Sequence, residues 1–373
     1  MKKVFSHPKW RSLLKIFLFI CLFSTFTFLI RFLDENIFEY NAPYGYFHYP
    51  PNRTLPFFRK GEAEAGVIGE FGIRESSQKT KTNCNYMLLG DSQTFGSGIF
   101  WEDSFSEILN RETNCQWTNI SMPGFTLENE YAIYLVSKNK VQFEHLFLVI
   151  YGNDIYETGD TPDFIHFVDK QKWYTQLLGF FLPERTRMYL KKEYFGSVQT
   201  RMEKEIEKFA NTKYEKHKNK VQKKKSDIEV GDEDFFSFRT LYSISPNYFK
   251  ESLDVRSVSQ KNFRRWKRIL EKFHNELNKS NKKLTFVYIP LDVEFDPIRY
   301  QVYESIGFPM QSNWLKGDSE FIQELQSISK TFGTNLIDMR FVFRKQKHLL
   351  QKEDIHFNEK ANRLIADTIK KSL

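Results

Sequence analysis

Short runs of apolar residues recur along this chain and predict the strands of a sheet. The first three are Tyr86–Leu89, Gln116–Ile120 and Leu146–Ile150, of which the last is the most continuous. Two further runs follow nearer the C-terminus, at Leu284–Pro290 and Asn335–Asp338. Runs of this length, bounded by turn-forming residues, are typical of buried strands.

Amphipathic segments separate these runs and predict helices at Glu128–Lys140, Ser257–Lys279 and Ser319–Phe332. The second has the strongest helical periodicity, with apolar residues at Phe263, Trp266, Leu270, Phe273 and Leu277. Its basic residues lie mostly on the opposite face: Arg264, Arg265, Lys267 and Arg268. A last amphipathic helix follows Asn358, which is a suitable N-cap. Short strands that alternate with helices predict an α/β fold with a parallel sheet.

The segment from 161 to about 255 departs from this alternation and predicts a mostly helical insertion. Its first part is rich in aromatic residues, and a charged helix is expected around Thr200–Lys225, ending in a run of lysines. The aromatic stretch 164–181 is either a lid or acceptor-binding wall, or a surface that packs against the membrane or the core. The lysine run is either a site for polyanions or phospholipid headgroups, or the solvated face of a helix.

The N-terminal 33 residues have the pattern of a single transmembrane helix. Residues 16–30 are apolar apart from one serine and two threonines, and snorkelling of Lys15 and Arg31 extends the span to about twenty residues. Basic residues precede this segment and acidic residues follow it, which predicts a cytoplasmic N-terminus and an extracytoplasmic remainder. The alternative is a cleaved signal peptide, although no Ala-x-Ala-like site follows the apolar run.

Three regions are therefore expected along the 373 residues. Residues 1–33 form a cytoplasmic tip and transmembrane anchor, and residues 34–80 form an irregular membrane-proximal segment with several prolines among aromatics. Residues 81–373 form the α/β domain, which contains the insertion. A chain of this length can bury one sizeable core and an insertion.

Composition narrows the possible partners. The net charge is +8, but charges of both signs are interspersed, and the hydrophobic fraction of 40% is ordinary for a globular protein. Zinc-finger spacing, a Walker loop and an RNA-binding aromatic block are all missing from the sequence. We therefore expect no nucleic-acid partner.

The first chemical signal is Gly90-Asp91-Ser92, directly after the first predicted strand. A glycine at the end of a strand permits a sharp turn into a helix, and a serine in that turn holds its hydroxyl out of the sheet. An activated nucleophile must occupy such a position. An ordinary strand-to-helix turn has the same local sequence, so this motif alone does not decide between the two.

Polar residues also follow the other predicted strands. Gly124 comes after the second run, Asn153 after the third, and Asp354 and His356 lie just before the last helix. Since the carboxyl ends of parallel strands meet at one edge of a sheet, these residues are expected to converge with Ser92.

The residue types fit acyl transfer. Ser92 would attack, His356 would act as the base, and Asp354 would orient the imidazole. The backbone N–H groups of Ser92 and Gly124 and the side-chain amide of Asn153 would form the oxyanion hole. This chemistry needs no cofactor and no metal ion, and none is predicted. Asp91 and Asp154 are expected to tie their turns together through hydrogen bonds to the backbone.

In these blocks the chain resembles the SGNH (GDSL-type) hydrolase family. The blocks are Gly90-Asp91-Ser92, Gly124, Gly152-Asn153-Asp154, and Asp354 with His356, in the order that the family has them. The resemblance covers residues 84–160 well and 284–373 more loosely. It implies a flavodoxin-like three-layer α/β/α sandwich and esterase chemistry. The family's commonest acid lies three residues before the histidine, where this chain has Glu353, so Glu353 is the alternative to Asp354. Some members of the family work without a strong acid partner.

Two cysteines gain significance if the domain lies outside the cytoplasm. Cys84 and Cys115 stand at the starts of the first two strands, which are usually neighbours in a doubly wound sheet. A disulfide is feasible there, at the edge opposite the candidate site. The alternative is a pair of free, partly buried thiols.

Three functions remain after these observations. The first is a membrane-anchored serine esterase that removes an O-acyl group from a cell-envelope carbohydrate or lipid. The second is an O-acyltransferase that uses the same triad to modify an envelope polysaccharide. The third is an SGNH-like protein that binds envelope polymers or proteins without turnover. The oligomeric state is not predicted.

Overall fold

The computed structural model describes residues 39–41, 46–49, 51–59, 62–76, 81, 83–157, 241–242, 245–258, 260–351 and 355–373. The predicted transmembrane segment, most of the 161–255 insertion, Glu353 and Asp354 lie outside these residues. From Tyr40 onward the described residues belong to one compact unit, formed by Tyr40–Thr161 and Lys204–Leu373. No helix among the described residues is long and apolar enough to cross a membrane.

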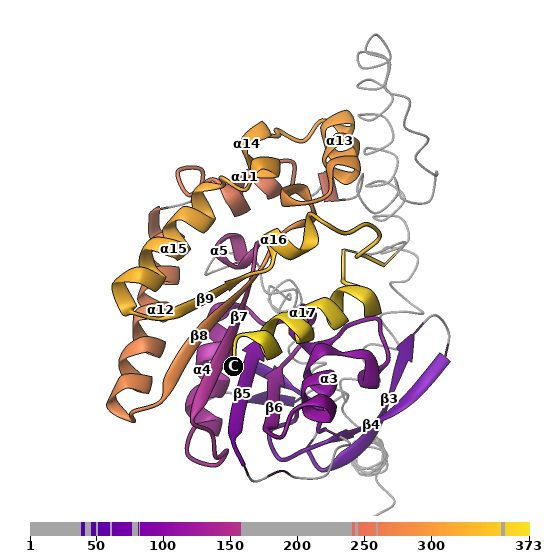
Figure 1. Ribbon diagram of the computed structural model, residues 1–373, viewed down its shortest axis with the longest axis vertical. Coiled ribbons are helices and arrows are strands. Elements are labelled where there is room, and N and C mark those ends of the chain that lie inside the picture. The colour runs from indigo at the N-terminus through magenta and orange to yellow at the C-terminus, as the bar shows by residue number, and fades with distance from the viewer. Residues whose placement is uncertain are drawn as a thin grey trace, which may run out of the picture. The chain divides into compact units, whose positions relative to one another are not determined.

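A parallel sheet of five strands forms the centre of this unit (Figure 1). Its strands are β5 (Asn85–Gly90), β6 (Gln116–Ser121), β7 (His145–Tyr151), β8 (Lys283–Ile289) and β9 (Asn335–Asp338). They lie in the order β6-β5-β7-β8-β9, which is the flavodoxin-like doubly wound order. The chain moves outward from β5 first to one side and then to the other, so the switch point lies between β5 and β7.

Helices cover both faces of the sheet, as predicted. On one face α3 (Phe105–Glu112) packs with α17 (Glu359–Lys371), where Asn362 Oδ1 accepts a hydrogen bond from the N–H of Phe105 at 3.1 Å. On the other face lie α4 (Leu127–Ser137), α12 (Gln260–Lys279) and α15 (Glu320–Phe332). The rings of Tyr134 and Phe273 join α4 to α12, and those of Trp266 and Phe321 join α12 to α15.

Shorter helices connect these layers. Between β5 and β6 these are α2 (Ser92–Phe95) and the 3-10 helix η2 (Trp101–Asp103). After β7 the chain forms α5 (Asp154–Glu157), α11 (Tyr248–Leu253), the 3-10 helix η3 (Asp292–Glu294), α13 (Pro297–Ile306), α14 (Ser312–Lys316) and α16 (Arg340–Phe343). Helix α11 lies in the stretch that sequence assigned to the insertion, yet Tyr248, Phe249 and Leu253 are buried in the core.

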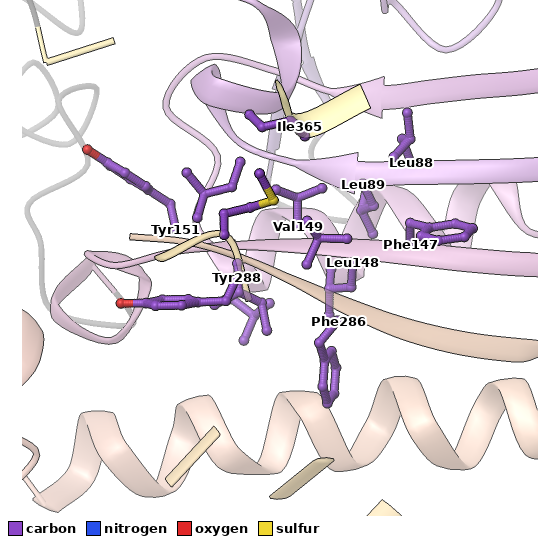
Figure 2. Close-up of a cluster of buried hydrophobic side chains, with 14 of the residues drawn as sticks. Leu88, Leu89, Phe147, Leu148, Val149, Tyr151, Phe286, Tyr288 and Ile365 are labelled. Atoms are coloured by element: carbon purple, nitrogen blue, oxygen red, sulfur yellow. The ribbon is translucent and has the colours of Figure 1, made fainter. Parts of the chain in front are cut away.

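The core is built from the strand residues that the apolar runs contain. Figure 2 shows Leu88, Leu89, Phe147 and Phe286 extending from β5, β7 and β8, together with Ile365 of α17. The strands read as nearly continuous apolar runs because both faces of a parallel sheet are covered.

The segment 34–80 differs from the expectation of irregular structure. It contains two two-stranded sheets, one of β1 (Glu39–Asn41) with β2 (Tyr46–His48) and one of β3 (Arg53–Arg59) with β4 (Glu62–Ile68), of which the second is antiparallel. Pro56 pairs with Ala65 in the second ladder. A proline is tolerated there because both strands of a two-stranded sheet are edges. Pro56 was therefore a poor indicator of irregular backbone.

Cys84 and Cys115 form a disulfide, with their Cα atoms 4.6 Å apart. The bridge lies just before the first residues of β5 and β6, where Asn85 pairs with Gln116. It therefore staples the amino ends of two neighbouring strands, opposite the edge on which Ser92 lies.

Candidate active site

Ser92 is the first residue of helix α2, two residues beyond the end of β5. The Asp91 carboxylate caps this helix by accepting a hydrogen bond from the N–H of Gln93 at 2.9 Å. Gly90 permits the close packing of strand and helix, because a Cβ there would lie 2.9 Å from Thr94 Cβ and 3.2 Å from Val149 Cβ. The strand–turn–helix geometry of a nucleophile elbow is therefore present.

His356 lies beside this serine, although 264 residues separate the two in sequence. Its Nε2 atom is 2.9 Å from Ser92 Oγ, within hydrogen-bond distance. Both residues are half-buried, so the pair is also open to solvent. Helix α17 begins three residues after the histidine, and Asn358 caps it by accepting from the N–H of Ala361 at 3.1 Å. The expected N-cap thus anchors the segment that carries the imidazole.

Gly124 and Asn153 lie on the two sides of Ser92 at the same edge of the sheet. Strand β5 lies between β6 and β7, and Gly90 pairs with Ser121 at the end of β6. Gly124 follows three residues after Ser121, and Asn153 follows two residues after the end of β7. Asn153 is 5% exposed, whereas Gly124 is exposed. Two of the predicted oxyanion donors, Gly124 and Asn153, therefore come from the loops that flank Ser92.

Two carboxylates tie the site's turns to the backbone, as their positions predicted. Asp91 does so through Gln93, and Asp154 accepts from the N–H of Tyr151 at 3.1 Å. Burial raises the pKa of Asp91, while the Gln93 N–H and the nearby His356 act in the opposite direction. Burial also raises the pKa of Tyr151 well above its ordinary value, so its hydroxyl stays protonated at neutral pH.

The loop after β8 supports the loop that carries Asn153. Gly152 lies so close to this loop that a Cβ would be 2.7 Å from Leu291 Cγ and 3.0 Å from the Leu291 nitrogen. Its own N–H donates to the Ile289 carbonyl at 3.1 Å. The backbone at residue 152 is thus fixed against β8, and only glycine fits there without displacing a neighbour.

A buried polar cluster follows this loop. Asp292 accepts a hydrogen bond from the Tyr303 hydroxyl at 2.6 Å and faces Arg299 at 3.4 Å. Burial raises the pKa of Asp292, and the Arg299 charge lowers it. Arg299 also donates to the carbonyl of Gln351 at 3.2 Å. The cluster therefore connects η3 and α13 to the segment that leads to His356.

The two candidate acids, Asp354 and Glu353, lie outside the described residues. Within the described part of the chain, no group of three or more histidine, cysteine, aspartate or glutamate residues is arranged to hold a metal ion. The side chains of two glutamines, Gln93 and Gln351, contact the segment around His356, and the sequence analysis did not identify either of them. The position of Gln93 directly after the predicted nucleophile is a signal that could have indicated it, whereas Gln351 has no such signal.

No family model and no curated protein matches this sequence. Solved structures resemble it at low identity. One is a member of the lipolytic G-D-S-L family from Veillonella parvula, 13% identical over 77% of this chain and 96% of that chain, with a TM-score of 0.34. The psychrotrophic esterase EstA from a Pseudoalteromonas species is 12% identical over 78% of this chain and 96% of its own, with a TM-score of 0.37. An acetyl xylan esterase, AlAXEase, is 12% identical over 78% and 99%, with a TM-score of 0.38. Similarity at this level does not establish a shared family or activity.

Proposed function

We propose that this chain is a serine ester hydrolase of the SGNH type, with Ser92 as nucleophile and His356 as general base. The observation that carries this proposal is the 2.9 Å contact between Ser92 Oγ and His356 Nε2 at the carboxyl edge of a parallel sheet. A non-catalytic binding protein has no need for a half-exposed serine and imidazole at that distance. The geometry thus favours the enzyme over the binding module.

Acylation of the enzyme begins at the serine. His356 accepts the hydroxyl proton on Nε2 while Ser92 Oγ attacks the ester carbonyl. Negative charge develops on the carbonyl oxygen, and the N–H groups of Ser92 and Gly124 and the amide of Asn153 are the proposed donors to it. Collapse of the tetrahedral intermediate breaks the bond between the former carbonyl carbon and the alcohol oxygen. The imidazolium returns the proton to the departing alcohol, which leaves the acyl group on Ser92.

Deacylation repeats these steps with water. His356 takes a proton from the water as its oxygen attacks the acyl carbon, and it then protonates Ser92 Oγ as the second intermediate collapses. The products are a carboxylic acid and the free enzyme. Asp354, or Glu353 in its place, is the proposed partner that orients the imidazole during both half-reactions.

The substrate class follows from the proposed location. The disulfide between Cys84 and Cys115 supports an oxidising, extracytoplasmic compartment. The predicted N-terminal anchor would hold the domain at a membrane surface. Acylated carbohydrates and lipids of the cell envelope are the esters available there, so we assign the substrate to this class.

Covalent labelling with a fluorophosphonate tests the proposal. The wild type is expected to gain one adduct on Ser92, which Ser92→Ala abolishes and His356→Ala reduces by a factor on the order of 10²–10⁴. Ser280→Ala and His274→Ala remove a serine and a histidine far from the site and serve as matched controls. The proposal is contradicted if the folded wild type is not labelled, or if all four variants are labelled as fast as the wild type.

The fate of the acyl group separates hydrolysis from transfer. An acetylated donor is supplied with and without a glycan acceptor, and the acetyl group is followed into free acetate or into the glycan. Hydrolysis predicts acetate in both cases. The aromatic stretch 164–181, which would provide an acceptor surface, lies outside the described residues.

A further inference from the structure

The side-chain amide of Gln93 holds the backbone on both sides of His356. Its Oε1 accepts from the N–H of Phe357 at 3.2 Å, and its Nε2 donates to the carbonyl of Ile355 at 3.3 Å. Gln93 is 4% exposed; its hydrogen bond with Phe357 is buried, and the one with Ile355 is partly buried. One planar amide group therefore hydrogen-bonds to both peptide units of His356.

Gln93 is also the residue next to the nucleophile. It belongs to α2, whose turn Asp91 fixes through the backbone N–H of Gln93 itself. Gln93 thus connects the turn that carries Ser92 to the backbone of His356, although 264 residues separate the serine from the histidine. A displacement of the Gln93 amide would change the distance between Oγ and Nε2 directly.

We propose that Gln93 is the positioning residue that keeps the imidazole of His356 against the hydroxyl of Ser92. This role rests on the proposed function, since it matters only if the two groups exchange a proton. Gln93 hydrogen-bonds to Asp91, Ile355 and Phe357, and not to Ser92 Oγ or the imidazole of His356. It acts through the backbone of the segment that carries the base.

A second glutamine completes the support from the opposite side. The N–H of Gln351 donates to the His356 carbonyl at 2.9 Å. Its side-chain amide donates to the carbonyls of Ser97 at 2.8 Å and Phe357 at 3.2 Å. Gln351 thus closes the loop around His356 and ties it to the turn after α2. Gln93 remains the only one of the two that joins this loop to the helix beginning at Ser92.

The chemistry of the contact requires an amide. A glutamate would turn an oxygen toward the Ile355 carbonyl, where a donor is needed, and would add a negative charge beside the base. A methionine has a similar volume but would leave the Phe357 N–H and the Ile355 carbonyl without this partner. Gln93→Met therefore removes both hydrogen bonds, and Gln93→Glu removes the one to Ile355.

The test compares these variants with a control amide in the full chain. Asn110 makes the same kind of contact at the amino end of β6, where it accepts from the N–H of Trp117 and donates to its carbonyl, both at 2.8 Å. Asn110→Leu removes a buried amide clamp far from Ser92. Thermal unfolding, ester turnover and the rate of fluorophosphonate labelling are measured for each folded variant.

We expect Gln93→Met to lower kcat by about 10–100-fold with little change in KM, because a misplacement by about 1 Å costs on the order of 10²-fold. Asn110→Leu is expected to lower the unfolding temperature and to leave kcat per folded molecule unchanged. In a His356→Ala background, Gln93→Met is expected to cause no further loss, since the group that it positions is gone. If Gln93→Met does not fold, Gln93→Glu replaces it, and a loss of kcat at least as large is expected, because the carboxylate faces the Ile355 carbonyl and adds a negative charge beside the base.

Three results overturn parts of this account and are distinguishable. A wild-type kcat in a folded Gln93 variant overturns the positioning role. An equal loss in the presence and absence of His356 overturns it as well, because it assigns the effect to general structure. A wild type that neither labels nor turns over esters overturns the proposed function first, and the positioning role with it.

Discussion

The carboxyl group of Glu294 is fully buried. Its surroundings allow us to predict how the free energy of unfolding depends on pH. Glu294 accepts hydrogen bonds from the Tyr288 hydroxyl, from the N–H of Leu291 at 3.2 Å and from the Ser319 hydroxyl at 3.0 Å. Burial raises its pKa from 4.5 to about 7, and the Tyr288 hydrogen bond and the Arg340 charge oppose only part of that shift. Glu294→Gln keeps the shape of the side chain and removes its titration.

The sign follows from proton binding. Because the pKa is higher in the folded chain than in the unfolded chain, the folded state binds the proton more tightly between pH 4.5 and 7. Its contribution to stability is therefore fully present below pH 4.5 and is lost as pH rises through about 7. A shift of this size corresponds to about 3 kcal/mol, since each pKa unit is worth ~1.4 kcal/mol.

Urea unfolding followed by tryptophan fluorescence measures the effect. The free energy of unfolding is determined at several pH values from 4.5 to 8 for the wild type and for Glu294→Gln. The stability of the variant relative to the wild type is expected to increase by about 3 kcal/mol across this range and to level off above pH 7. Other titrating groups cancel in the difference between the two proteins.

Glu304→Gln, at an exposed position of α13, controls for the loss of one surface carboxylate. The reasoning is refuted if the difference curve for Glu294→Gln is flat, or if the variant loses stability relative to the wild type as pH rises. A flat curve would mean that the folded chain stabilises the ionised and the neutral form of Glu294 equally, and a loss would mean that it stabilises the ionised form better.

Three further predictions concern the disulfide and the loop after β7. Loss of the Cys84–Cys115 bridge, which closes a separation of 31 residues, should lower the free energy of unfolding by about 3–4 kcal/mol and leave the labelling rate of folded protein unchanged; stability unaffected by reduction would contradict this. Asn153→Ala should cost about 2.7–4 kcal/mol of transition-state stabilisation, measured as kcat, and normal turnover would remove it from the oxyanion hole. Gly152→Ala should destabilise the chain by about 1–3 kcal/mol and lower kcat, because its Cβ would push against Leu291. Unchanged melting and kcat in that variant would show that the loop adapts freely.

The sheet and its helices could be predicted from sequence because their signals are local. Strand β9 has the predicted bounds, Asn335–Asp338. Strand β6 differs from its predicted run by one residue at one end, and β5, β7 and β8 differ by one residue at each end. Apolar runs and capping residues specify such elements without reference to the rest of the chain. The pairing of β3 with β4 was not predicted, because it depends on contacts between the two strands and because the proline and aromatic residues of β3 resemble a loop.

The candidate site divides in the same way. Ser92 and His356 could be proposed because each follows or precedes a recognisable element, and a parallel sheet brings such positions to one edge. The roles of Gln93 and Glu294 could not, since a glutamine or glutamate in sequence is usually a surface residue. Their burial comes from partners brought near by the fold. For Gln93 these partners lie more than 260 residues away.

The most direct test of the central claim is a crystal structure of the chain after reaction with a fluorophosphonate. The account predicts phosphorus bonded to Ser92 Oγ and His356 Nε2 beside it. It also predicts a phosphonyl oxygen about 2.7–3.1 Å from the N–H groups of Ser92 and Gly124 and from the Asn153 amide. An adduct on another residue, or a phosphonyl oxygen that points away from all three donors, would contradict the account.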